Sequence, residues 1–252
     1  RGSRYQVYVL VYDSRDTRVS ANGEMFATEL RWLRDRVIGP KKDLTIVGHS
    51  MGAIVSRHAL NVLTRDHADG IDRFGKVRLV AVDPPMHGYP GLGDHGFLGA
   101  LNGIFSGVVP AGYMDMRAES DFFRGNHKGV RGVMDQPLPG NVRFEPVFAQ
   151  SGDTALDYTE GELAALPDKL VSLYRDGVPV TGSTQFMNFF NGIRTSAPYF
   201  DLQIAMRGMK DDGVLDAEHV RRALLQAFPR FPGDHTTVVN SPELLDYLES
   251  RH

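Results

Sequence analysis

The feature that most constrains the fold is a regular alternation of short apolar runs with longer amphipathic stretches. Residues 5–12, 44–48 and 77–82 are almost entirely apolar or β-branched, which is typical of strands buried on both faces of a sheet. Between them, residues 22–38 and 51–64 place apolar side chains at helical spacing. Because strands that alternate with helices over short connections form βαβ units, we predict an α/β fold with a mainly parallel sheet flanked by helices.

The composition narrows the class of protein. A chain of 252 residues, 42% of them hydrophobic, has enough material for one α/β domain with a buried core, so we expect residues 1–252 to form a single domain. The formal net charge of −3 argues against a nucleic-acid partner, since such proteins have an excess of Lys and Arg. There is no cysteine, which excludes disulfides, thiolate metal sites and cysteine nucleophiles. No apolar run is long enough for a membrane-spanning helix, so we expect a soluble domain of unassigned compartment.

The second half of the sequence has a different character. Residues 88–114 are rich in glycine and apolar residues, which fits either a mobile apolar flap over a pocket or a packed surface loop. Residues 142–149 predict a fourth strand, and residues 157–230 are mostly helical in pattern. A last helix is expected to begin at Ser241-Pro242.

The sequence Gly48-His49-Ser50-Met51-Gly52 is the strongest chemical signal in the chain. It has the form G-x-S-x-G and lies between a predicted strand and a predicted helix, the context of a nucleophilic serine on a sharp strand-to-helix turn. The two glycines leave room where side chains would collide. The turn exposes the Ser50 hydroxyl and places the Met51 N–H at a helix start, where it can stabilise an oxyanion. We therefore predict that Ser50 is a nucleophile.

Several segments resemble the α/β-hydrolase superfamily, and its lipases and esterases in particular. The stretch LTIVGHSMGAIVSRHAL (44–60) is similar to their nucleophile elbow, although Ala53 stands where glycine is usual, a variation also common among thioesterases. VDPPMHG (82–88) and MDMRAESDFFRGN (114–126) resemble segments that follow the elbow in lipases. The resemblance implies an α/β-hydrolase fold with a Ser-His-Asp triad.

An unactivated serine is a poor nucleophile near neutral pH, so a base is needed. In this family the chain order is serine, acid, histidine, and the histidine lies on a loop after the last strand. Of the nine histidines, His235 in residues 233–237 (GDHTT) occupies that place, and this segment resembles the family's histidine loop. We therefore predict His235 as the base. His49 lies inside the elbow, and we expect its side chain to point away from the nucleophile.

Three aspartates are candidates for the triad acid. Asp153 follows the fourth predicted strand in a form that resembles the family's acid loop, and it is the preferred candidate. Asp212 resembles the Asp-Gly-Val acid loop of another lipase group, and Asp83 ends the third predicted strand, where thioesterase domains and some lipases place their acid. With Asp153 as the acid, residues 157–230 would be a helical insertion between acid and histidine that covers the site.

The second oxyanion donor has a weaker signal. The earlier strand whose loop supplies this donor in the family is not found upstream of residues 5–12. Either the first predicted strand takes over this role, with residues 13–16 as the oxyanion loop and Ser14 as a candidate donor, or the chain is part of a longer polypeptide. A cysteine-free chain of this kind also suits an enzymatic domain cut from a large exported bacterial toxin.

Together these features predict a serine hydrolase that cleaves carboxylic esters of acyl lipids, as a lipase, phospholipase or esterase. The first alternative is a thioesterase domain that releases acyl chains from a carrier, and the second is a hydrolase fold that only binds a ligand. No cofactor is implied, and no residue spacing suggests a catalytic metal. The basic stretch 31–42 could contact an anionic membrane surface transiently, although a solvated helix face has the same composition.

Overall fold

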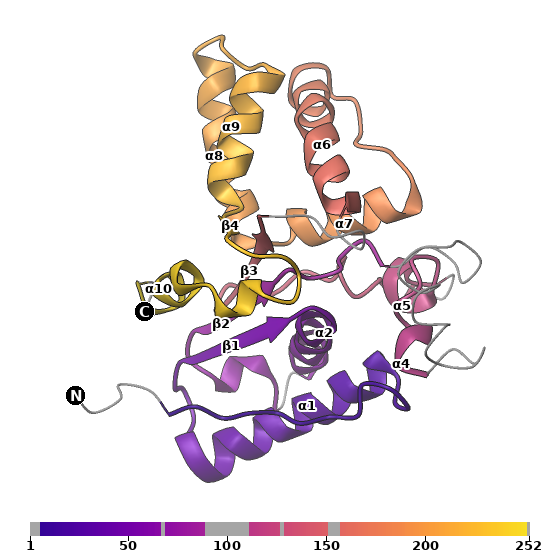
Figure 1. The fold of residues 1–252 in the computed structure, drawn as a ribbon, viewed down its shortest axis with the longest axis vertical. Coiled ribbons are helices and arrows are strands. Elements are labelled where there is room, and N and C mark those ends of the chain that lie inside the picture. The colour runs from indigo at the N-terminus through magenta and orange to yellow at the C-terminus, as the bar shows by residue number, and fades with distance from the viewer. Residues whose placement is uncertain (1–5, 67–68, 89–110, 127–128, 151–156, 251–252) are drawn as a thin grey trace.

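The computed structural model describes residues 6–66, 69–88, 111–126, 129–150 and 157–250. The chain is an α/β fold with a parallel four-stranded sheet flanked by helices (Figure 1). The strands are β1 (Leu44–His49), β2 (Val77–Val82), β3 (Val142–Ala149) and β4 (Arg230–Phe231). The α-helices are α1 (Val19–Leu33), α2 (Met51–Arg65), α4 (Ala111–Met114), α5 (Asp121–Arg124), α6 (Asp157–Asp176), α7 (Thr184–Arg194), α8 (Ala197–Asp211), α9 (Ala217–Ala227) and α10 (Pro242–Ser250). Shorter segments are the π-helix η1 (Arg34–Ile38) and the 3-10 helices η2 (Ile71–Arg73) and η3 (Val238–Asn240).

The sheet has the order β1-β2-β3-β4, and each neighbouring pair is parallel. β2 is buried along its whole length, as its apolar sequence predicts. Side chains alternate between the two faces: Leu79 and Ala81 belong to the core shared with α1 and α2, whereas Val80 and Val82 belong to the core shared with η3 and α10. Because the strands are parallel, the carboxyl ends of β1, β2 and β3 lie side by side at one edge.

The first predicted strand, residues 5–12, departs from the expected fold. Residues 6–12 have no regular secondary structure, and Val7, Val9 and Val11 are 82%, 82% and 85% exposed. The prediction of a strand buried on both faces is therefore wrong for these residues. A β-branched composition suits a sheet, but a strand forms only where a neighbouring strand and a covered face are available to it. Within the described residues, no backbone hydrogen bond joins this segment to β1 or to another strand.

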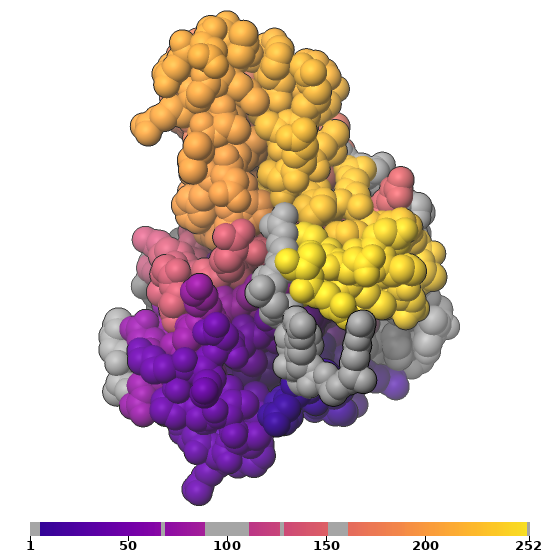
Figure 2. All heavy atoms as spheres, turned by 90° about the vertical axis from the view of Figure 1, so that its left-hand side faces the viewer, coloured from indigo at the N-terminus to yellow at the C-terminus, as the bar shows by residue number. Residues whose placement is uncertain are grey.

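Between β3 and β4 the chain forms the four helices α6 to α9, within the residues for which the sequence predicts helices. They stand together beyond the sheet, on the side away from α1, and project as a separate lobe in the space-filling view (Figures 1 and 2). The ring of Phe148 on β3 lies 6.4 Å from those of Phe189 on α7 and Phe228 after α9, which ties the lobe to the sheet. Of the predicted flap 88–114, residues 89–110 lie outside the described part of the chain.

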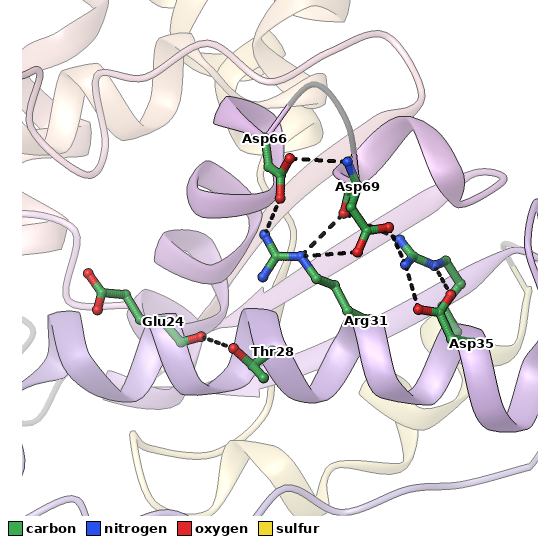
Figure 3. A network of polar contacts seen from close by, with 7 residues as sticks. Glu24, Thr28, Arg31, Asp35, Asp66 and Asp69 are labelled. Carbon is green, nitrogen blue, oxygen red and sulfur yellow. Dashed lines mark hydrogen bonds and ion pairs between the residues drawn. The ribbon is translucent and has the colours of Figure 1, made fainter.

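Ion pairs join the end of α1 to the loop that follows α2 (Figure 3). A nitrogen of the Arg31 guanidinium lies 2.9 Å from Asp66 Oδ2, and the buried Arg34 contacts both Asp35 and Asp69. Hydrogen bonds to these carboxylates, that to Asp35 first, raise the pKa of Arg34. Two positive charges of the basic stretch are thus paired within the molecule, and its membrane contact stays a prediction. No helix in the described part of the chain is both long and apolar enough to cross a membrane.

Candidate active site

Ser50 lies on the sharp turn between β1 and α2. Its φ of 54° and ψ of −131° form a backbone conformation that non-glycine residues rarely adopt. The Ser50 N–H donates to the Val82 carbonyl at 2.9 Å, which fixes the turn to the end of β2. A Cβ on Gly48 would lie 2.7 Å from the Ala53 Cα, so the backbone can approach this closely only at a glycine. The turn therefore holds Ser50 at the carboxyl edge of the sheet.

His235 lies on the loop after β4, and its Nε2 is 2.8 Å from the Ser50 Oγ. Asp234 closes this loop: its Oδ1 accepts from the N–H groups of Thr236 at 2.9 Å and Thr237 at 2.8 Å, and from both hydroxyls at 2.8 Å. These threonine donors, the hydroxyls first, lower the pKa of Asp234 to about 2. The histidine loop is thus a turn stabilised by its own side chains, and it places His235 beside Ser50.

Asp83 extends this chain of hydrogen bonds beyond His235. Its Oδ2 lies 2.7 Å from the His235 Nδ1, and its Oδ1 accepts from the Ala149 N–H at 3.3 Å. The Asp83 side chain is 2% exposed, and its φ of 48° is again in the left-handed region. The structure therefore buries this carboxyl group with hydrogen bonds to both of its oxygens.

Of the three candidate acids, the structure brings Asp83 to His235. The preferred candidate, Asp153, lies outside the described residues, and Asp212 is an exposed residue at the end of α8. The Nδ1 of a histidine has at most one hydrogen to donate, and in the described structure the acceptor beside it is Asp83. The described residues thus bring one of the two alternatives, Asp83, to His235, and Asp153 as the acid stays a prediction.

The register of the sheet explains why Asp83 is within reach. β1 and β2 pair with His49 opposite Val82, so the next residues, Ser50 and Asp83, leave two adjacent strands at the same level. Neighbouring strands are only about 4.8 Å apart. A single strand spacing therefore separates the strands that position Asp83 and Ser50.

The two candidates for stabilising the oxyanion are the Met51 N–H and Ser14. The Met51 N–H is the first of α2, so it has no acceptor within the helix, and the helix dipole favours negative charge there. Ser14, the candidate second donor, is exposed, and its carbonyl lies against Gly112. The side chain nearest to Gly52 is that of Tyr12, whose hydroxyl would lie 3.4 Å from a Cβ at that glycine. The structure thus places the Met51 N–H at the start of α2, directly after the nucleophile, and Ser14 as the second donor stays a prediction.

His49 is a member of the site that the sequence analysis missed. Its Nε2 lies 2.6 Å from the carbonyl oxygen of His235, and the two ring centroids are 4.8 Å apart. The alternation of side chains along β1 could have indicated this contact with His235. His49 and Gly48 face opposite sides of the sheet, and η3 and α10, which follow the histidine loop, pack on the side of His49. By contrast, His58 and His87 lie in the core, where burial lowers each pKa to about 4.

Comparisons with known proteins add no name to this site. No protein-family model matches the chain, and neither a curated protein nor a solved structure matches it. The assignment of the site therefore depends on its geometry and on the sequence motifs described above.

Proposed function

We propose that this chain is a serine hydrolase of the α/β-hydrolase type that cleaves carboxylic esters through an acyl-enzyme. The observation that supports this is one imidazole bonded on both sides, with Nε2 at 2.8 Å from Ser50 Oγ and Nδ1 at 2.7 Å from Asp83 Oδ2. A carboxylate beside Nδ1 favours the tautomer with its hydrogen there, which makes the Nε2 lone pair available to the serine proton. The strained turn between a parallel strand and a helix is the structural context of such a nucleophile.

In the proposed acylation, the Ser50 Oγ bonds to the acyl carbon while His235 Nε2 takes the hydroxyl proton. The carbonyl π electrons move onto the oxygen, and the Met51 N–H at the start of α2 stabilises this oxyanion. The Asp83 carboxylate offsets the charge of the imidazolium. His235 then gives its proton to the departing alkoxide oxygen as the acyl–oxygen bond breaks, which leaves the acyl group on Ser50.

In the proposed deacylation, a water molecule takes the place of the alcohol. His235 Nε2 removes one proton from this water as its oxygen bonds to the acyl carbon. The second tetrahedral intermediate collapses, the bond to the Ser50 Oγ breaks, and the proton returns from His235 to Ser50. The products are a carboxylic acid and the original site.

The substrate class is proposed from the sequence around the site. The apolar, glycine-rich residues 88–114 favour a hydrophobic acyl chain, so we propose an acyl lipid as the ester. A thioester is the second candidate, since the aspartate at His235 is Asp83 at the end of β2, the place where thioesterase domains and some lipases have their acid. A comparison of kcat/KM for an ester and a thioester of the same acyl chain separates the two substrates.

The first test is covalent labelling with a fluorophosphonate, a probe that reacts with activated serines. We expect the wild-type protein to be labelled at Ser50, Ser50→Ala to take up no label, and His235→Ala to react orders of magnitude more slowly because the nucleophile loses its base. Ser56→Ala is the matched control on the same helix, since the Ser56 hydroxyl donates to the Gly52 carbonyl at 2.8 Å and not to a histidine. Equal labelling of wild type and Ser50→Ala, or no labelling of either, would refute the proposed function and favour a fold that only binds a ligand.

A further inference from the structure

The imidazole of His49 contacts His235 at two places that the proposed reaction does not use. Its Nε2 lies 2.6 Å from the His235 carbonyl oxygen. Because a carbonyl oxygen only accepts, the hydrogen is on the His49 Nε2, which donates. The two rings are also in contact, with centroids 4.8 Å apart and planes tilted by 40°. His49 is thus joined to both the main chain and the side chain of His235.

The position of His49 in the chain makes this contact informative. His49 is the last residue of β1, directly before Ser50, and β1 is paired with β2 along its whole length. The same rigid strand end therefore presents the nucleophile and a hydrogen-bond donor to the main chain of its base. A shift of the His235 loop relative to β1 would have to break this hydrogen bond.

The histidine loop connects β4 to η3, whose buried Val238 packs with Val80 and Val82 of β2. The loop follows β4, which has two residues, and it includes Gly233, whose φ of 112° is a conformation that favours glycine. Asp234, Thr236 and Thr237 bond to one another and are on the exposed side of the loop. The bonds from His235 to Asp83 and Ser50 hold its ring, and the bond from His49 holds its carbonyl group.

We propose that His49 is a positioning residue for His235: its hydrogen bond to the His235 carbonyl fixes the loop and so sets the distance from His235 Nε2 to Ser50 Oγ. The chemical use of that distance depends on the proposed function, whereas the anchoring of the loop does not. The donor must also be uncharged, because an imidazolium 4.8 Å away would oppose the positive charge that forms on His235. Burial lowers the pKa of His49 from its ordinary value and favours the neutral donor, while the hydrogen bond to the His235 carbonyl acts in the opposite direction.

Two substitutions separate the hydrogen bond from the ring contact. His49→Phe keeps an aromatic ring beside His235 but removes the donor, whereas His49→Gln restores an N–H donor at a similar reach. We expect fluorophosphonate labelling of Ser50 to slow about 10- to 100-fold in His49→Phe, the range expected when a reacting group is displaced by a fraction of an ångström to one ångström. In His49→Gln the rate should stay within about threefold of wild type. For ester turnover, kcat should fall in His49→Phe while KM stays nearly unchanged, because the substrate contacts are intact.

A second readout does not need the reaction. The His235 Nδ1–H bonded to Asp83 should give a strongly downfield proton resonance in the wild-type NMR spectrum, be lost to exchange in His49→Phe and return in His49→Gln. Thermal unfolding of each variant shows that it is folded. Unchanged labelling and an unchanged resonance in folded His49→Phe would overturn the positioning role. If wild type takes up no label but the resonance still depends on the residue at position 49, the proposed hydrolase function fails and the anchoring of the loop stands.

Discussion

The carboxyl edge of the sheet and the helical lobe α6–α9 differ in which residues have a backbone conformation with positive φ. At the sheet edge two non-glycine residues, Ser50 and Asp83, have positive φ. In the described part of the lobe the positive φ angles belong to Gly177 and Gly213, where they are unstrained. Such strain costs about 1–3 kcal/mol per residue and persists only where the surroundings enforce it. Two of the three non-glycine residues with positive φ in the described chain are the proposed nucleophile and acid, and the third is Lys41 before β1.

The two regions also treat a buried carboxyl group differently. Asp83 is 2% exposed, and its oxygens bond to His235 and to the Ala149 N–H. Glu162 on α6 is 8% exposed, and its Oε2 has no hydrogen-bond partner within the described structure. Burial therefore raises the pKa of Glu162 to about 8 and keeps it protonated at neutral pH. The comparison teaches that burial alone does not mark a functional carboxylate, and that Asp83 differs from Glu162 by its hydrogen bond to His235.

The largest expected effect separates Asp83 from Asp212, the aspartate at the end of α8. Asp83→Asn should fold, since asparagine tolerates the left-handed region, but kcat for ester cleavage should fall roughly 10⁴-fold because an amide favours the wrong tautomer of His235. Asp212→Asn should keep kcat within about threefold, because Asp212 is exposed and outside the hydrogen-bond chain. Steady-state kinetics of both variants provide the measurement. A crippled Asp153→Asn beside an active Asp83→Asn would restore our preferred acid and show that the contact of Asp83 is structural.

The next effect compares a glycine of the elbow with one of the lobe. A Cβ on Gly48 would lie 2.7 Å from the Ala53 Cα and 2.9 Å from the Gly52 carbonyl oxygen, all backbone atoms. Gly48→Ala should therefore lower the free energy of unfolding by about 1–3 kcal/mol and slow labelling of Ser50, because the turn must shift. Gly208→Ala on α8 meets nothing within 4 Å and should raise stability by up to about 1 kcal/mol. Urea unfolding measures both, and equal effects at the two glycines would contradict the strained turn.

The sequence predicted those features whose causes are local. The turn at Ser50 was predictable because its glycines and the strand and helix on either side are contiguous, and the parallel α/β sheet followed from the same alternation. Asp83 was harder, since its nearness to His235 depends on the register of β1 with β2 and on a loop that returns after β4. Residues 6–12 were predicted wrongly because their composition describes a strand without supplying the neighbour it would need. Local sequence patterns could not show contacts between residues that only the tertiary structure brings together.

The smallest effect concerns Glu162, the carboxyl group of the lobe without a partner for Oε2. Its folded pKa of about 8 lies above the ordinary value of 4.5, so the folded state binds more protons than the unfolded state between these values. Stability therefore falls as pH rises across this window, by roughly 1 kcal/mol between pH 6 and pH 7 for this group. The glutamine in Glu162→Gln cannot titrate. Between pH 6 and pH 7, the unfolding free energy of the variant should therefore rise relative to that of wild type by roughly 1 kcal/mol. Glu218→Gln is the matched control, because it makes the same substitution at an exposed position on α9. If Glu162→Gln and Glu218→Gln respond alike to pH, the Glu162 carboxyl group is solvated or paired in solution, and the contrast with Asp83 does not hold.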